Sequence, residues 1–244
     1  MVVNGDVISD IDLAELSRAH LEPGAEATIA LFSVKDMKTF GLVTLDSQDQ
    51  IVSFEKKSPK NEGLRWINAS AYILNPSVID MIPAGKVSLE REIFLVLASR
   101  MKLRGWKHIG FWYDIGKIPD YVTAALELLE RQDYPSAEAR QQASVAGVEQ
   151  PSYLGDDCIV EEDAKLGPRA ILSPKVRGKA GAKVRDTIVF QETVFGENCL
   201  VEESLIAERT VIGKGVTVGK GSIIAGQITA PEAANGSPGS IVLN

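Results

Sequence analysis

Apolar positions along the first half of the chain recur with two different periods. Short runs rich in β-branched and aromatic residues predict strands, and apolar residues three and four positions apart predict amphipathic helices. By these criteria, strands are expected at residues 1–3, 26–34, 41–45, 51–55, 67–74 and 109–113. Helices are expected at residues 10–21, 88–100 and 119–131. Because strands and helices alternate, this part of the chain is predicted to form an α/β domain.

A six-residue repeat begins at Leu154 and continues to about Gly226. An aliphatic or aromatic residue opens each unit, at Leu154, Val160, Leu166, Leu172, Val184 and Phe190, with Gly178 as the misfit. A small or apolar residue follows four positions later, at Cys158, Ala164, Ala170, Val176, Ala182, Ile188 and Val194. The repeat slips by one residue at Phe195 and again at Ile212. This period fits neither an α-helix nor a hairpin meander, and it predicts short strands stacked into a β-helix.

The segment between these two regions differs from both in composition. It contains Pro135 and is otherwise rich in Ala, Gln and Ser, which predicts a linker. The chain is therefore divided into an α/β part at residues 1–132, a linker at 133–150, a β-helix at 151–229 and a tail at 230–244.

The composition narrows the possible classes of function. The chain has 244 residues and a net charge of −7, which argues against a nucleic-acid or anionic-membrane surface but not against a small anionic substrate. No apolar run approaches the roughly 18 residues of a membrane span, and the start lacks the basic segment of a signal peptide. We therefore expect a soluble cytoplasmic protein. Cys158 and Cys199 occupy small positions of the repeat and are predicted to be core thiols.

Six short motifs, together with the repeat, carry a resemblance to a known family. They occur in one order, at residues 2–6, 40–43, 54–56, 67–69, 88–94 and 110–116. This order and spacing resemble the sugar-1-phosphate nucleotidyltransferases, especially the mannose-1-phosphate guanylyltransferase branch, which also has a hexapeptide β-helix. The resemblance implies an α/β-then-β fold: the C-terminal part of a Rossmann-like nucleotidyltransferase domain, followed by a left-handed parallel β-helix.

The resemblance also implies an activity and a cofactor. The family joins a nucleoside triphosphate to a sugar 1-phosphate and releases pyrophosphate, with Mg²⁺. Such a transfer depends on positioning and charge neutralisation, for which two carboxylates holding a hard cation are suited. By resemblance, Asp6 and Asp114 are these ligands, each at the C-terminal end of a predicted strand. On the residues alone, Asp6 could equally be a turn residue and Asp114 a helix cap.

The sugar-phosphate contacts follow from the same resemblance. Lys56 corresponds to the lysine that reaches the sugar phosphate, and Glu55 to the carboxylate that accepts sugar hydroxyls. Gly41 corresponds to a glycine where backbone meets sugar, and Asn68 to an adjacent polar contact. Taken alone, Lys56 is also consistent with a solvated lysine in a short basic run. Two departures bear on sugar binding: the family's proline stands two positions later, and the glycine of its Asn-Ala-Gly motif is Ser70 here.

One family motif does not occur in this sequence. The glycine-rich Gly-x-Gly-x-Arg loop and its nearby lysine bind the triphosphate in the family, and neither is found here. The resemblance therefore implies that the nucleotide-binding front half of the domain is missing. A sheet without that half would expose edges and apolar surface. We therefore expect a homo-oligomer or a partner chain to cover it, and no catalysis by this chain alone.

Three functions are consistent with the sequence to different degrees. The first is a nucleotidyltransferase making a GDP-mannose-like product, although other bases and glucose 1-phosphate stay open. The second is a non-catalytic regulatory or scaffold subunit of a nucleotidyltransferase complex. The third, a hexapeptide acyltransferase, is disfavoured because such enzymes use a histidine of the β-helix, whereas His20 and His108 precede the repeat. His20 is expected to be structural, as are Trp66 and Trp112, and no role is assigned to His108.

Overall fold

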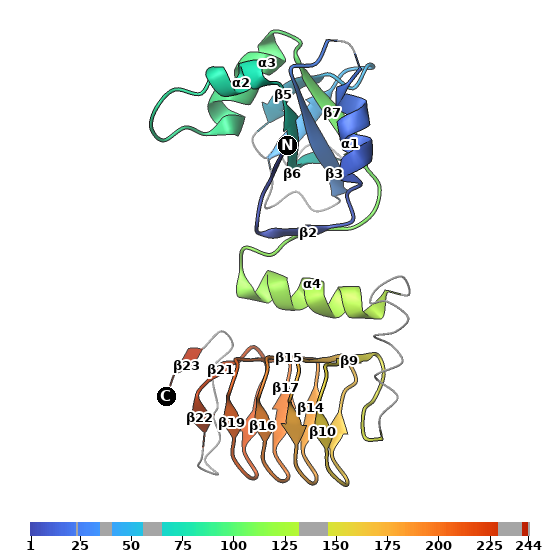
Figure 1. Ribbon diagram of the computed structural model, residues 1–244, viewed down its shortest axis with the longest axis vertical. Coiled ribbons are helices and arrows are strands. Elements are labelled where there is room, and N and C mark those ends of the chain that lie inside the picture. Colours follow the sequence, from blue (N-terminus) through green and yellow to red (C-terminus); the bar gives the residue numbers. More distant parts are fainter. Residues whose placement is uncertain (23, 35–40, 56–64, 132–145, 229–240, 244) are drawn as a thin grey trace. The chain divides into compact units, whose positions relative to one another are not determined.

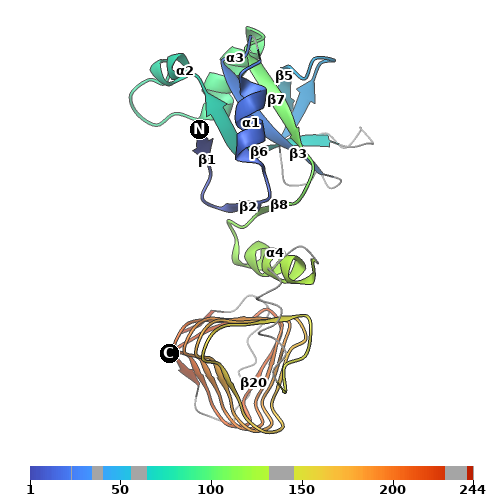
Figure 2. The same cartoon turned by 45° about the vertical axis from the view of Figure 1, so that its right-hand side comes forward.

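The computed structural model describes residues 1–22, 24–34, 41–55, 65–131, 146–228 and 241–243. The chain forms two compact units, Met1–Gly116 and Lys117–Asn244, which are drawn from two directions in Figure 1 and Figure 2. The finer division at residues 132, 150 and 229 stays a prediction. Among the described residues, no helix has the length and apolar character needed to cross a membrane.

A mixed sheet forms the centre of the first unit. Its strand order is β5-β4-β6-β3-β7, and β1 pairs with β6. The β3–β7 pair is parallel and the other pairs are antiparallel. The strands are β1 (Val2–Val3), β3 (Ala27–Val34), β4 (Leu42–Leu45), β5 (Ile51–Glu55), β6 (Arg65–Leu74) and β7 (Leu103–His108).

Both faces of this sheet are buried. Alternate residues of a strand point to opposite faces, so Ile29 and Leu31 belong to one apolar cluster and Ala30 to another. Helix α1 adds Leu16 to the Ala30 cluster, while the other helices add Phe94 and its neighbours to the first. Figure 1 shows α1 and the α2–α3 group on different sides of the sheet. The helices are α1 (Leu13–His20), α2 (Pro76–Asp80), the π-helix η1 (Leu89–Phe94) and α3 (Leu95–Ser99).

The apolar run at residues 109–113 does not form the single strand that was predicted. Strand β7 ends at His108, and Ile109 is 93% exposed. The chain turns at Gly110, where an added Cβ would stand 2.2 Å from the Asp10 carboxylate. The single-strand prediction was therefore wrong, because a carboxylate from a distant segment occupies the space beside this glycine.

Strand β7 was not predicted, because Gly105 interrupts its apolar pattern. In the structure, Gly105 lies against Leu31 and Leu45, and an added Cβ would stand 2.5 Å from the Leu31 side chain. The glycine therefore allows close packing inside a strand. The next strand, β8 (Trp112–Asp114), is not part of the mixed sheet and pairs antiparallel with β2 (Val7–Ser9) as a two-stranded ribbon.

The second unit contains helix α4 (Ile118–Glu130) and the predicted left-handed parallel β-helix. Its strands stack in three parallel sheets, one on each side of the triangular coil seen in Figure 2. One sheet contains β10 (Ile159–Val160), β13 (Arg177–Gly178), β16 (Val194–Phe195), β19 (Val211–Ile212) and β22 (Gln227–Ile228). Another contains β11 (Lys165–Leu166), β14 (Lys183–Arg185), β17 (Leu200–Glu202) and β20 (Thr217–Val218). The last contains β9 (Ser152–Leu154), β12 (Ala170–Leu172), β15 (Thr187–Val189), β18 (Leu205–Ile206), β21 (Ile223–Ala225) and β23 (Ile241–Leu243).

Stacked apolar side chains fill the interior of the β-helix. Leu166 pairs in register with Val184, which pairs with Val201, and all three are buried. Gly178, the misfit of the repeat, lies where an added Cβ would stand 3.2 Å from the Leu166 side chain, so the larger neighbour fills its place. Cys199 is buried, and burial raises the pKa of its thiol to about 12. The prediction of a core thiol is therefore confirmed for Cys199.

The predicted register of the repeat was wrong in two coils, because the slips expected at Phe195 and Ile212 each occur one strand earlier, at Val189 and Ile206. Phe190, assigned to the interior, is 37% exposed, whereas Val189 is fully buried. The first slip occurs at the corner before this strand, where Asp186 adopts a left-handed φ of 50°. The corner is one residue shorter than a six-residue period requires. The small inward positions therefore move from Ile188 and Val194 to Thr187 and Thr193, both fully buried, while Ile188 is also buried but outside the interior cluster.

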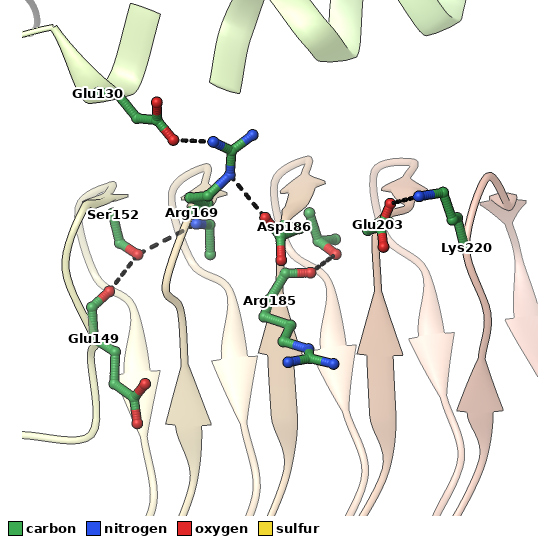
Figure 3. Close-up of polar contacts among 10 residues, drawn as sticks. Glu130, Glu149, Ser152, Arg169, Arg185, Asp186, Glu203 and Lys220 are labelled. Carbon is green, nitrogen blue, oxygen red and sulfur yellow. Dashed lines mark hydrogen bonds and ion pairs between the residues drawn. The ribbon is translucent and has the colours of Figure 1, made fainter. Parts of the chain in front are cut away.

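Ion pairs connect α4 and successive coils at one row of corners. Arg169 pairs with Glu130, the last residue of α4, and its Nε lies 2.7 Å from Asp186 Oδ1 on the next coil. Lys220 pairs with Glu203 in the same way, as Figure 3 shows. Partly exposed pairs of this kind contribute at most about 1 kcal/mol each. They therefore favour one coil-to-coil register, while the buried stack provides most of the stability.

We expect Leu166→Asp to unfold the β-helix, because it places an unpaired charge in the stacked interior. The expected cost exceeds about 4 kcal/mol and would be measured by thermal unfolding followed by circular dichroism. Lys165→Ser, on the exposed side of the same strand, is the control and should leave the midpoint nearly unchanged. An unchanged midpoint for Leu166→Asp would contradict the assignment of this residue to the interior.

The corrected register makes opposite predictions for two adjacent residues. Val189→Asp should abolish the cooperative unfolding transition of the β-helix, whereas Phe190→Asp should shift the midpoint only slightly, since its side chain already contacts solvent. Comparison of the two melting curves checks this directly. A larger decrease of the unfolding midpoint for Phe190→Asp than for Val189→Asp would contradict the corrected register and support the one expected from the sequence.

Candidate active site

The ribbon of β2 and β8 brings Asp6 and Asp114 together. Asp6 directly precedes β2, and Asp114 is the last residue of β8. In the antiparallel register Val7 faces Asp114, and the Ile115 N–H donates to the Asp6 carbonyl oxygen over 2.9 Å. Two residues far apart in sequence thus lie side by side at one end of the ribbon, whose strands β2 and β8 are labelled in Figure 2.

Both carboxylates face the space beside Gly116. A Cβ added to this glycine would stand 3.2 Å from Asp114 Oδ1 and 3.4 Å from Asp6 Oδ2. The Gly116 N–H also donates to Asp114 Oδ1 over 3.0 Å, which fixes the orientation of that carboxylate. The absent side chain therefore leaves open the region on which the two carboxylates converge.

This arrangement fits a hard divalent cation. Two neighbouring carboxylates repel each other, and a cation between them offsets that repulsion. Mg²⁺ accepts oxygen ligands and commonly binds through one or two carboxylates together with water and substrate phosphates. Within the described part of the chain, no cluster of three or more His, Cys, Asp or Glu side chains is placed to hold a metal ion. Mg²⁺ bound through two carboxylates commonly keeps its other positions for water and substrate oxygens.

Three of the residues predicted to bind the sugar phosphate, Gly41, Glu55 and Asn68, lie on or directly beside three neighbouring strands. Glu55 ends β5 and faces Leu42 at the start of β4, and Gly41 directly precedes that strand. Leu42 also faces Ile67 of β6, so the same register places Gly41 beside Asn68. Gly41 is exposed, and an added Cβ there would meet no atom within 4 Å. The predicted contact at Lys56 lies outside the described residues.

Asn68 is engaged in a hydrogen-bond network. Its Nδ2 donates to the Tyr72 hydroxyl over 3.0 Å and to the Glu90 carboxylate, and its Oδ1 accepts from the Ser70 N–H over 2.9 Å. Burial raises the pKa of the Tyr72 phenol, although the Asn68 hydrogen bond acts in the opposite direction. The network orients the Asn68 side chain and connects β6 to η1. Glu90 was not among the predicted site residues, since nothing in the sequence pairs it with β6.

A bulge in β6 follows Asn68. The register with β3 changes between Ile29, which faces Tyr72, and Leu31, which faces Asn68. Ser70, inside the bulge, has a left-handed φ of 62°. The resemblance placed a glycine at this position, and glycine adopts such a φ without the steric cost that a Cβ brings. Bulges often orient side chains near functional sites. This bulge lies between Asn68 and Tyr72 within β6.

The bulge also connects the sheet to the ribbon. The Trp112 Nε1–H donates to the Ala69 carbonyl oxygen over 2.9 Å, and the Asn4 N–H donates to the Ser70 carbonyl oxygen over 3.0 Å. Trp112 is buried and stacks on Phe32 at a centroid distance of 5.9 Å, as expected for a core aromatic residue. The segments that carry Asp6 and Asp114 are thus attached to the strand that carries Asn68.

The two histidines take part in different contacts. His20 bonds through Nδ1 to Thr28 Oγ1 at 2.9 Å and through Nε2 to the Asn75 side chain at 3.1 Å, contacts of the kind expected for a structural residue. His108, to which no role was assigned, is buried, and its Nε2 lies 2.8 Å from Asp10 Oδ1. Asp10 was missed as well, because the pair joins segments that are distant in sequence.

Both parts of the chain match profiles of known protein families. The profile of the family described as "Nucleotidyl transferase" matches residues 1–131, and the profile described as "GMPPB C-terminal domain" matches residues 148–235. The chain belongs to the nucleotidyl transferase family. The resemblance drawn from the six motifs and the repeat is therefore confirmed.

The relatives that this chain matches are named as mannose-1-phosphate guanylyltransferases. The chain is 32% identical over 187 residues to probable mannose-1-phosphate guanylyltransferase 2 of Oryza sativa subsp. japonica. The aligned region covers 77% of this chain and 50% of that protein. The chain is 33% identical over 198 residues to the mannose-1-phosphate guanylyltransferase of Mycobacterium tuberculosis, covering 75% of this chain and 55% of that protein. A third relative, the catalytic subunit beta of Drosophila melanogaster, is 32% identical over 68% of this chain. The chain spans about half the length of the relatives it matches.

The left-handed backbone at Ser70 leads to a stability prediction. Ser70→Gly should stabilise the protein by about 1 kcal/mol, because it removes the cost of a left-handed backbone in a residue with a Cβ. Chemical denaturation would measure the change. Ser70→Val is the matched opposite substitution and should destabilise, since β-branched residues tolerate this φ poorly. Equal stability of all three proteins would contradict the bulge geometry.

Proposed function

We propose that this chain supplies the metal and sugar-phosphate contacts of an enzyme that makes a nucleotide sugar, as mannose-1-phosphate guanylyltransferases do. The observation that carries the proposal is the convergence of the Asp6 and Asp114 carboxylates beside Gly116, in a chain of the nucleotidyl transferase family. The substrates proposed are mannose 1-phosphate and GTP, which follow from the names of the relatives. The products are GDP-mannose and pyrophosphate.

Asp6 and Asp114 are proposed to hold Mg²⁺. The ion supplies charge neutralisation at the reacting phosphates when it is bound. The two carboxylates fix its position through the ribbon of β2 and β8, and Gly116 leaves room for substrate oxygens beside them. Positioning of this kind accounts for much of the rate in phosphoryl-type transfer, where the protein forms no covalent bond.

Four further residues are proposed to bind the sugar phosphate. Lys56 neutralises the phosphate of mannose 1-phosphate, and Glu55 accepts hydrogen bonds from sugar hydroxyls. Gly41 lets the backbone approach the sugar, and Asn68, held by its network, presents a fixed polar edge. These roles rest on the family resemblance, and the register of β4, β5 and β6 supports them by placing Gly41, Glu55 and Asn68 on neighbouring strands.

Binding of mannose 1-phosphate to the purified chain tests the proposal. Isothermal titration calorimetry with Mg²⁺ should show binding that weakens at least about tenfold with EDTA, because the metal offsets phosphate charge. Mannose 1-phosphate should bind more tightly than glucose 1-phosphate. Asp114→Asn should reproduce the effect of EDTA, and Asp80→Asn, at the exposed end of α2, is the control with the same change in charge. Binding that ignores both Mg²⁺ and Asp114 would contradict the proposed site.

A further inference from the structure

The ribbon that carries Asp6 and Asp114 is small. Strands β2 and β8 contain three residues each, and they pair only with each other among the described strands. An isolated two-stranded pair of this length is marginally stable in water. The position of the two carboxylates must therefore depend on contacts at both ends of the ribbon.

Asp10 closes the end of the ribbon opposite the two carboxylates. It directly follows β2, and its Oδ1 accepts from the Phe111 N–H over 2.7 Å, just before β8 begins. The same oxygen lies 2.8 Å from His108 Nε2, at the end of β7 in the main sheet. A single carboxylate oxygen therefore joins β2, the turn before β8 and the mixed sheet.

His108 gives this junction a rigid base. Its side chain is 4% exposed, and its residue pairs with Phe32 in the parallel register of β3 and β7. The rings of Phe32 and Trp106 flank it at centroid distances of 6.1 and 6.0 Å. A buried imidazole with fixed neighbours can hold a carboxylate in one place, since few other orientations are open to it.

Gly110 is fitted to the same junction. An added Cβ would stand 2.2 Å from Asp10 Oδ1 and 2.6 Å from Oδ2. Only glycine lets the turn approach the carboxylate this closely. The turn at Gly110, the Asp10 carboxylate and the His108 ring are thus in mutual contact. They lie at the end of β2 opposite Asp6.

We infer that Asp10 and His108 are positioning residues, which fix the register of the β2–β8 ribbon and thereby hold the Asp6 and Asp114 carboxylates at the spacing that one divalent cation requires. The inference rests on the proposed function, because it concerns the same pair of carboxylates. Asp10 acts through the two hydrogen bonds that its Oδ1 accepts. Its negative charge, at the far end of the ribbon, is not what supports metal binding.

The affinity of the full chain for Mn²⁺, measured by the electron paramagnetic resonance signal of the free ion, tests this inference. Asp10→Ala should weaken Mn²⁺ binding by about tenfold, the lower range for residues that orient metal ligands. Asp10→Asn keeps the accepting oxygen and should restore most of the affinity. Gly110→Ala, which displaces the carboxylate without removing it, should weaken binding as Asp10→Ala does.

His20→Ala is the matched control. His20, like His108, joins segments of the first unit through hydrogen bonds of its imidazole ring. Its partners are Thr28 and Asn75, which are not part of the ribbon. It should lower the thermal midpoint and leave Mn²⁺ affinity unchanged. If Asp10→Ala and Gly110→Ala retain wild-type affinity, or if His20→Ala weakens it equally, the inference fails. It also fails if Asp10→Asn is as weak as Asp10→Ala, because charge would then be the cause. Absence of Mn²⁺ binding by the wild-type chain would instead overturn the proposed function itself, together with this inference.

Discussion

The candidate site depends on the antiparallel pairing of β2 with β8. This pairing places Val7 opposite Asp114 and joins Asp6 to Ile115, so that two carboxylates from distant parts of the chain face one glycine. The β6 bulge attaches this ribbon to the mixed sheet, and the same strand carries Asn68. A shift of one residue in the pairing would turn the Asp114 side chain to the opposite face and would separate the pair.

The β-helix could be predicted from sequence because each coil repeats the same physical requirement. An inward aliphatic residue must stack on its equivalent, and Leu166, Val184 and Val201 do so in register. The error at Phe190 has the same origin: the pattern shows that a residue is skipped but not at which corner. The strand register of the folded β-helix shows where the shorter corner lies, since Lys165 pairs with Lys183 but Ala170 already pairs with Thr187.

Predictions for the first unit failed where glycine changes packing. Gly105 concealed a strand because close packing against Leu31 leaves no apolar signature at that position, and Gly110 divided an apolar run because a carboxylate from another segment lies against it. Asp6, Asp114 and the sugar-phosphate residues could be proposed in advance only through the order of motifs. Asp10 and Glu90 could not, since their partners are set by tertiary contacts.

Strand β6 connects the two parts of the site. Trp112 joins β8 to the bulge after Asn68, and Asn4 joins the segment before Asp6 to the same bulge. Both segments that carry the carboxylate pair are therefore attached to the strand that carries Asn68. Crystals of the full chain soaked in Mn²⁺, with anomalous scattering recorded, would test the central claim most directly. The account predicts one anomalous peak bonded to oxygens of both Asp6 and Asp114 beside Gly116. A peak bonded to neither carboxylate, or to only one of them, would contradict it.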